Sequence, residues 1–253
     1  MSVVVWHDVE CGSYAEDLPL WRGLAAEYGD PVLDVGAGTG RVTLELARAG
    51  YRVTALDRDP ALLAALAQRI PDLPVGRSSS VDPVSPRALV STVVADAREF
   101  ALDQRFPLVI VPMQTIQLLG GVEGRLRFLR CAHRHLSAGG VVAMAIAEVL
   151  DLYEVIDGMA MPLPDVREED GFVYSSQPTA VRADQDGFVL ERRRETVSPA
   201  GERTVEENLI RLDRLTARAL AREGEAAGFT AIERRHVRAT EDYSGSEVVV
   251  LRA

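Results

Sequence analysis

Three glycines alternate with single residues in the segment Gly36–Gly40, directly after Val32–Val35, a run of buried-strand character that includes Asp34. A helix-forming run follows from Val42 to Ala49, and Gly50 is placed to end it. Glycines at a strand-to-helix turn remove side chains where the backbone must approach a ligand closely. The helix that begins there directs its free N–H groups and its positive dipole end at that ligand. The segment therefore predicts a binding site for a small-molecule cofactor.

Two carboxylates follow, each near the end of a short strand-like run. Asp57 ends the run Val53–Asp57 and lies 21 positions after Gly36. A carboxylate about 20 residues beyond such a turn can accept hydrogen bonds from both ribose hydroxyls of a nucleoside. Asp96 follows the run that begins at Thr92. Because open α/β sheets bind ligands at the carboxyl ends of their strands, we expect both carboxylates at one edge of a sheet.

The elements that must position these residues recur along the chain as alternating strand-like and helical patterns. Further strands are expected within residues 106–115, 141–147, 230–237 and 246–251. Helices are expected at residues 17–28, 60–69 and 122–136, with a last helix ending before Gly228. In the helix over 122–136, His133 shares the apolar face and is expected in the core, whereas His135 lies off that face and is expected in solvent.

Together these features resemble the class I S-adenosylmethionine (SAM)-dependent methyltransferases, whose motif I reads D-x-G-x-G-x-G. Asp34 stands two positions before Gly36, and one residue separates each pair of glycines. The nicotinamide fingerprint G-x-G-x-x-G spaces its glycines differently, which disfavours an NAD-binding oxidoreductase. The resemblance covers residues 30–147 well and 214–253 moderately. It is nearest to the small-molecule branch that includes glycine and amino-sugar N-methyltransferases.

The resemblance implies an α/β fold with a Rossmann-like, seven-stranded and mostly parallel sheet of order 3-2-1-4-5-7-6, flanked by helices. It implies that Asp57 binds the ribose hydroxyls of SAM, that Asp96 accepts from the adenine amino group, and that Tyr14 lies over the methionine end. For Arg41 two roles stay open: a partner of the SAM carboxylate, or a solvent-facing arginine in the first helical turn. The residues that the resemblance places around SAM are Tyr14, Asp34, Gly36, Ala37, Gly38, Arg41, Asp57, Arg58, Asp96, Ala97, Arg98, Pro112 and Met113.

Methyl transfer from a sulfonium is an in-line displacement, so the protein mainly aligns the acceptor and excludes water. Related amino-sugar enzymes carry a histidine where this chain has Leu118, which argues against that base. The segment Val111–Met113 offers no carboxylate, so no metal is expected. No catalytic residue is identified. Candidates for contact with the acceptor are Gln114, Gln117 and Glu148, the last with the alternative of an exposed strand-end carboxylate.

Two segments interrupt the alternation of strands and helices. Residues 71–87 contain several prolines and a serine run, which predicts a surface loop. Residues 148–212 contain strand-like runs near 171–175, 187–196 and 204–212, which predict a small antiparallel β insert after strand 5. The expected domains are a SAM-binding core of residues 1–147 and 213–253 and an inserted subdomain of residues 148–212. In the family, an insert at this position roofs the active site and shapes the acceptor pocket.

The composition narrows the function. A net charge of −10 argues against a nucleic-acid substrate. Cys11 and Cys131 have no disulfide-like or metal-like spacing, no apolar run is long enough to span a membrane, and the first ten residues lack a basic leader. We therefore expect a cytoplasmic, metal-independent methyltransferase, and a homo-oligomer is compatible with the sequence. Its substrate is a nitrogen or oxygen atom of a small metabolite. The alternative is a protein that binds SAM or S-adenosylhomocysteine (SAH) without methyl transfer, such as a sensor or scaffold.

Overall fold

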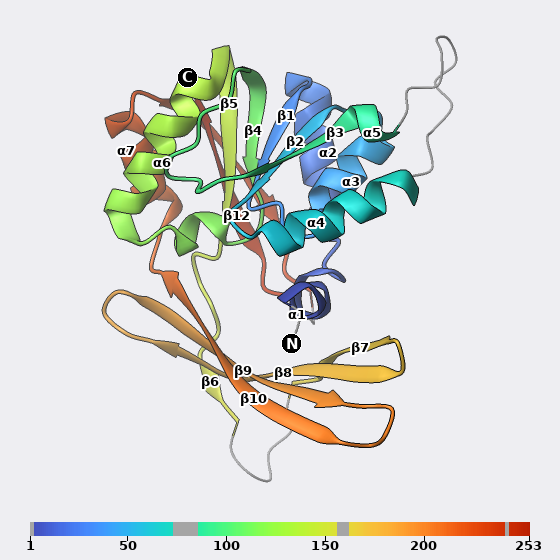
Figure 1. The fold of residues 1–253 in the computed structure, drawn as a ribbon. Helices are drawn as coiled ribbons and strands as arrows, with labels where there is room; N and C mark the ends of the chain where they lie inside the picture. Colours follow the sequence, from blue (N-terminus) through green and yellow to red (C-terminus); the bar gives the residue numbers. More distant parts are fainter. Residues whose placement is uncertain (1–2, 73–85, 156–161, 241–242) are drawn as a thin grey trace. The chain divides into compact units, whose positions relative to one another are not determined.

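The computed structural model describes residues 3–72, 86–155, 162–240 and 243–253 (Figure 1). Contacts within the chain divide it into two units. The core unit comprises Ala15–Glu148 and Leu215–Ala253, and the inserted unit comprises Met1–Tyr14 and Val149–Arg214. Most of the loop predicted over residues 71–87 lies outside the described residues.

The core unit contains a seven-stranded sheet in the order β11-β12-β5-β4-β1-β2-β3. The first five strands along the chain pair in parallel, and β12 is antiparallel to both β5 and β11. This is the predicted order and direction of the strands, so the Rossmann-like fold is confirmed. The strands are β1 (Val32–Val35), β2 (Val53–Asp57), β3 (Val90–Val94), β4 (Phe106–Val111), β5 (Leu136–Ile146), β11 (Thr230–Val237) and β12 (Ser246–Arg252).

Helices cover both faces of this sheet, which explains why its central strands are apolar on both sides. α2 (Leu18–Tyr28) and α3 (Arg41–Arg48) share a buried cluster with one face, and α6 (Gly121–His135) and α7 (Ala217–Ala226) share one with the other (Figure 1). The remaining core helices are α4 (Pro60–Arg69), α5 (Pro86–Leu89) and the short 3-10 helices η1 (Ile70–Asp72) and η2 (Thr115–Leu118).

Short-range signals set several of the helix ends. α4 covers the predicted residues and begins after Asp59, whose side chain accepts a hydrogen bond from the Ala61 N–H at 2.8 Å. The prediction for His135 is wrong, because its ring is buried. Its Nε2 accepts from the Leu102 N–H at 3.0 Å, so Nδ1 carries the hydrogen and donates to the Cys131 carbonyl at 2.8 Å. His133 is half-buried, and its ring meets that of Phe229 edge-on.

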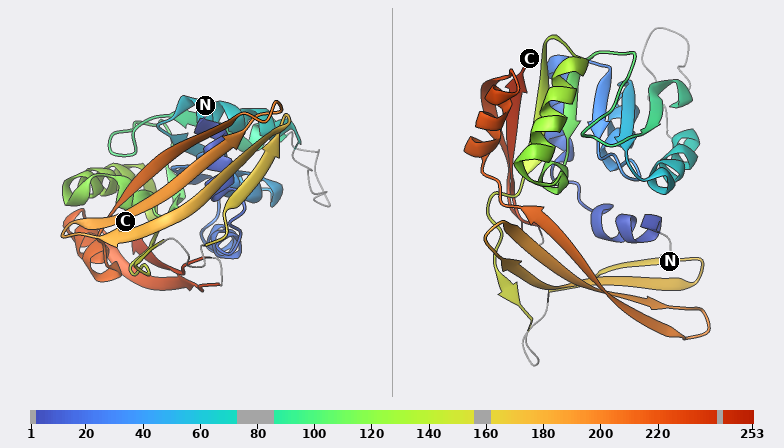
Figure 2. Two further views of the ribbon diagram at one scale, coloured as in Figure 1. Left: turned by 90° about the horizontal axis from the view of Figure 1, so that it is seen from below. Right: turned by 60° about the vertical axis from the view of Figure 1, so that its left-hand side comes forward.

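The inserted unit is built on an antiparallel sheet of order β10-β9-β8-β6, and β7 also pairs with β8. Figure 2 shows its three long strands, β8, β9 and β10, side by side. They cover the predicted runs 187–196 and 204–212 and residues 172–175 of the first run, and β8 continues to Ala183. The two shorter strands were not predicted. The bounds are β6 (Tyr153–Glu154), β7 (Asp165–Glu169), β8 (Phe172–Ala183), β9 (Gly187–Val197) and β10 (Arg203–Asp213).

The helix α1 (Val3–Cys11) packs against β7 and β8, although the sequence assigned residues 1–14 to the core. Glu10 accepts hydrogen bonds from Arg194 Nε at 2.7 Å and Nη2 at 2.9 Å, and from Ser176 Oγ at 2.8 Å. Burial alone would raise the pKa of Glu10, but these hydrogen bonds outweigh it and lower the pKa. Trp6 meets Tyr174 edge-on, at 5.6 Å between ring centroids. Long-range partners therefore fix α1 to the inserted sheet.

In the core unit, a buried ion pair connects α6 to α7. Arg125 donates from Nε and Nη2 to the two carboxylate oxygens of Glu223, each at 2.8 Å, and the side chains are 4% and 11% exposed. Arg125→Ala would leave Glu223 buried without its cation, so we expect the free energy of unfolding to fall by roughly 3 to 5 kcal/mol. Urea unfolding monitored by circular dichroism measures this loss.

The exposed pair of Arg127 and Glu99 is the matched control, because these side chains are 47% and 68% exposed. Arg127→Ala should change the stability little, since water and salt screen such pairs. If the two variants lose equal free energy of unfolding, the buried pair contributes no more to stability than the exposed pair.

Candidate functional site

The carboxyl ends of β1, β2 and β3 meet at one edge of the core sheet. The N–H groups of Gly36 and Ala37 donate to the Leu56 carbonyl at 2.8 and 3.1 Å. The Ala95 N–H donates to the Asp57 carbonyl at 3.0 Å. These bonds bring together the glycine-rich turn, the end of β2 and the segment that leads to Asp96, as the sequence predicted.

Asp57 joins the glycine-rich turn to the end of β2. Its Oδ2 accepts from the Gly38 N–H at 2.8 Å, and its Oδ1 accepts from the Asp59 N–H at 2.9 Å. The residue is half-buried, whereas the neighbouring Arg58 is exposed. A carboxylate offers about four lone-pair positions, so two backbone bonds leave room for further donors. The side chain can therefore hold the turn and accept hydroxyl groups from a ligand.

The glycine-rich turn has left-handed backbone conformations that suit glycine, with φ of 74° at Gly36 and 94° at Gly40. A Cβ at Gly36 would lie 2.5 Å from Thr115 Cγ2, and a Cβ at Gly40 would lie 2.2 Å from Leu66 Cδ1. The turn is thus packed between η2 and α4. Ala37, between the first two glycines, is buried.

Asp34 is a buried carboxylate with one oxygen unused. Thr43 Oγ1 donates to Asp34 Oδ2 at 2.7 Å, whereas Oδ1 has no hydrogen-bond partner among the described residues. Burial raises the pKa of Asp34 to about 6, against the lowering effects of the Thr43 hydrogen bond and the Arg41 charge. A buried acceptor of this kind beside a ligand-binding turn suits a cationic or N–H donor group.

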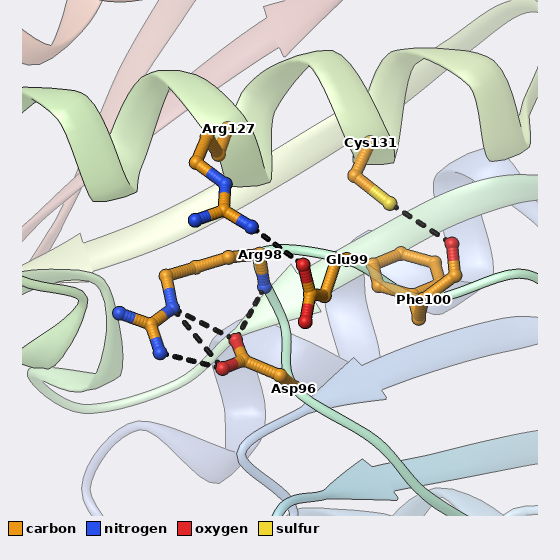
Figure 3. A network of polar contacts seen from close by, with 6 residues as sticks. All are labelled: Asp96, Arg98, Glu99, Phe100, Arg127 and Cys131. Carbon is orange, nitrogen blue, oxygen red and sulfur yellow. Dashed lines mark hydrogen bonds and ion pairs between the residues drawn. The ribbon is translucent and has the colours of Figure 1, made fainter.

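Asp96 has the opposite electrostatic environment (Figure 3). Its Oδ1 accepts from the Arg98 N–H at 2.8 Å and from Nε at 2.9 Å, and its Oδ2 accepts from Nη2 at 2.6 Å. The hydrogen bonds from Arg98 lower the pKa of Asp96 to about 2. Glu99 accepts from Arg127 Nη2 at 2.5 Å, which ties this segment to α6. Ala97, between the paired residues, is half-buried.

Arg41 begins α3 and is paired with a residue that the sequence did not single out. Its Nη1 and Nη2 donate to Asp17 at 2.5 and 2.8 Å, and Trp21 Nε1 donates to the same carboxylate at 2.8 Å. The Arg41 side chain is 10% exposed, so the solvent-facing alternative is wrong. Its pairing with the SAM carboxylate stays a prediction. The one signal for Asp17 was its place before α2, where it makes no side-chain cap.

The end of β4 is backbone-strained. Met113 has a φ of 54°, which is uncommon for a residue with a side chain, and such conformations persist where the surroundings enforce them. Pro112 is buried, and its carbonyl accepts from Thr115 Oγ1 at 3.1 Å. The Gln114 side chain is half-buried and makes no hydrogen bond within the described residues. It is thus the one acceptor candidate whose amide is uncommitted there.

The other two acceptor candidates bind the backbone. Gln117 is fully buried and contacts Ala147, and Glu148 Oε2 accepts from the Ala217 N–H at 3.0 Å. Their contact with an acceptor stays a prediction. Tyr14 is buried but belongs to the inserted unit. Among the described residues there is no cluster of three or more His, Cys, Asp or Glu that could hold a metal ion, and no described helix is long and apolar enough to cross a membrane.

Comparison with known proteins places this site in context. Residues 32–140 match the family described as "Methyltransferase domain". The cypemycin N-terminal methyltransferase of a Streptomyces species is 32% identical over 112 residues, which are 44% of this chain and 40% of that protein. The chain thus spans less than half the length of that curated relative.

Solved structures share the fold over nearly the whole chain. SAM-bound CalS10, an amino pentose methyltransferase from Micromonospora echinaspora, has a TM-score of 0.70 and 21% identity, and the match covers 98% of this chain and 97% of CalS10. The glycopeptide N-methyltransferase MtfA in complex with SAM has a TM-score of 0.58 and 26% identity, covering 94% of this chain and 95% of MtfA.

The environment of Asp34 predicts a pH dependence of stability. Its pKa of about 6 in the folded chain exceeds the ordinary value near 3.8, so its contribution to stability is fully present below pH 3.8 and is lost as pH rises through 6. Asp34→Asn cannot ionise. From pH 4 to pH 7, the variant should therefore gain about 2 to 3 kcal/mol relative to the unaltered protein, as measured by urea unfolding at each pH.

Asp96→Asn provides a control of opposite sign, because the pKa of Asp96 is lowered and its contribution is present above the ordinary value and lost at more acidic pH. A stability difference for Asp34→Asn that stays constant from pH 4 to pH 7 would contradict the raised pKa.

Proposed function

We propose that this protein is a SAM-dependent methyltransferase, on the premise that residues 32–140 form a methyltransferase domain of the predicted class I type. The proposed reaction is metal-independent transfer of a methyl group to a nitrogen or oxygen atom of a small molecule. The observation that carries the proposal is the hydrogen bond from the Gly38 N–H to Asp57, which places a carboxylate against the glycine-rich turn.

The residues at this edge of the sheet fit SAM. Asp57 retains acceptor positions for ribose hydroxyls, and Asp96 with the backbone of Ala97 offers an acceptor and a donor for an adenine ring. The unpaired Oδ1 of Asp34 matches a ligand that carries positive charge, because a cation would compensate the buried carboxylate. When bound, SAM supplies an electrophilic methyl group on a sulfonium.

The protein's part in the reaction is alignment of the acceptor and exclusion of water. The strained Met113 and the uncommitted amide of Gln114 follow β4, where the family places the reacting methyl group. We assign Gln114 to orienting a polar acceptor. Arg41 is held by Asp17 and would offer its guanidinium to the SAM carboxylate from a fixed position.

We propose an amino nitrogen of a small molecule as the acceptor. The curated relative is named an N-terminal methyltransferase, MtfA a glycopeptide N-methyltransferase and CalS10 an amino pentose methyltransferase. The net charge of −10 suits a basic acceptor better than a nucleic acid. We assign residues 148–212 to shaping the acceptor pocket. The cytoplasmic location and a homo-oligomeric state stay predictions.

Calorimetry with SAM and SAH, followed by incubation with SAM and a panel of small amines, tests the proposal. We expect saturable binding of both ligands and a gain of about 14 daltons in at least one amine, detected by mass spectrometry, because one hydrogen is replaced by a methyl group. Tight binding without turnover of any amine or hydroxyl acceptor would favour a SAM-binding sensor or scaffold. Absence of binding would contradict both functions.

A substitution at Asp57 tests the SAM site most directly. Asp57→Ala removes the acceptor of two ribose hydroxyls and of the Gly38 N–H, so we expect SAM affinity to fall by roughly 2 to 4 kcal/mol. Calorimetry gives the dissociation constant. Asp103→Asn, which alters an exposed carboxylate, is the control and should leave the affinity unchanged. An Asp57→Ala protein with unaltered affinity for SAM would show that Asp57 does not contact the ligand.

A further inference from the structure

Gln117 extends the core sheet beyond the end of β5. Its Oε1 accepts from the Ala147 N–H at 2.8 Å, and its Nε2 donates to the Ala147 carbonyl at 3.1 Å. β4 has already ended at Val111, which pairs with Met144, so β4 does not reach Ala147. The fully buried side-chain amide replaces the missing strand, because buried backbone groups must find partners.

Glu148 makes the next connection along the chain. Its Oε2 accepts from the N–H of Ala217, the first residue of α7, where a negative charge also interacts favourably with the helix dipole. The chain leaves the core unit after Glu148 and re-enters it at Leu215, which is 1% exposed. The Glu148 carboxylate therefore joins the outgoing and returning segments on the core side.

The other end of η2 contacts the glycine-rich turn. Thr115 packs on Gly36 so closely that a Cβ there would lie 2.5 Å from Thr115 Cγ2. η2 is only four residues long, and Gln117 lies two residues after Thr115. The same short helix thus touches the turn at one end and holds Ala147 at the other.

We propose that Gln117 and Glu148 are positioning residues that act as one joint, fixing the core ends of the outgoing segment at Glu148 and of the returning segment at Leu215 to the loop after β4. Within the core unit, the joint is connected through Thr115 to the glycine-rich turn. The link to SAM rests on the proposed function, whereas the joint itself rests on the hydrogen bonds alone.

Amide hydrogen exchange of the whole protein, read at Ala147 and Ala217, tests the joint. Gln117→Leu keeps a similar volume but loses both hydrogen bonds. We expect it to accelerate exchange at Ala147 by about tenfold or more, and also at Ala217, which Gln117 does not bind, by about threefold or more. Glu148→Ala should likewise accelerate exchange at Ala217, which Glu148 binds, and at Ala147, which it does not bind. If each variant accelerates exchange only at the amide that its own side chain binds, the proposal is wrong.

Two further variants sharpen the test. Glu148→Gln keeps an oxygen that can accept from Ala217, so it should restore most of the protection that Glu148→Ala loses. Asp151→Asn removes an exposed carboxylate three residues further on and should change neither amide. If Gln117→Leu does not fold, the comparison of Glu148→Ala with Glu148→Gln at Ala147 decides the proposal.

SAH serves as the probe for the connection to the turn. In the unaltered protein, saturating SAH should slow exchange at Ala147 and Ala217, and Gln117→Leu should abolish the effect at Ala217 while changing the SAH dissociation constant less than about threefold. Binding of SAH without any response at these amides would overturn the connection to the turn. Failure of SAH to bind would contradict the proposed function, while the ligand-free comparison would still decide the joint.

Discussion

The hydrogen bond between the Gly38 N–H and the Asp57 carboxylate fixes the geometry on which the site depends. Its partners are 19 positions apart, and it joins the turn after β1 to the end of β2. The other oxygen of Asp57 accepts from the Asp59 N–H just before α4. One carboxylate therefore holds the glycine-rich turn and the entry to the next helix. With the turn held in this way, Gly36 can pack against Thr115 and α3 can begin at Arg41.

Two further carboxylates of the site differ in how their charge is balanced. Asp96 has a bound cation, because Arg98 donates to both of its oxygens, and it stays ionised at any pH near neutrality. Asp34 has a hydroxyl partner and, among the described residues, no cation bound directly to it, and burial raises its pKa to about 6. A ligand gains most by bringing positive charge to Asp34, whereas at Asp96 it can gain only from hydrogen bonds. The site is therefore suited to a ligand whose charge is concentrated at one end.

The sequence predicted those features that depend on nearby residues. The glycine-rich turn and the start of α4 follow from local patterns, the strand order follows from the family resemblance, and the structure has each of them. Local patterns do not predict the partners of Arg41, Gln117 and Glu148, because these partners lie 24, 30 and 69 positions away along the chain. The error at His135 has the same origin: a helical projection places it off the apolar face of α6, but the loop at Leu102 covers it. Local periodicity cannot reveal which distant segment covers a side chain.

With α1 assigned to the inserted unit, the chain connects the two units at three places. Glu10 and Arg194, 184 positions apart, form a pair whose side chains are 8% and 16% exposed, so α1 cannot leave the inserted sheet without exposing or separating buried charges. The chain then crosses between the units after Tyr14 as well as around residues 148–149 and 214–215. Within the core unit, Glu148 binds Ala217 just after the returning crossing, and Asp17 binds Arg41 just after the first one. Buried charge pairing therefore assigns α1 to the inserted sheet, although α1 precedes the core in sequence.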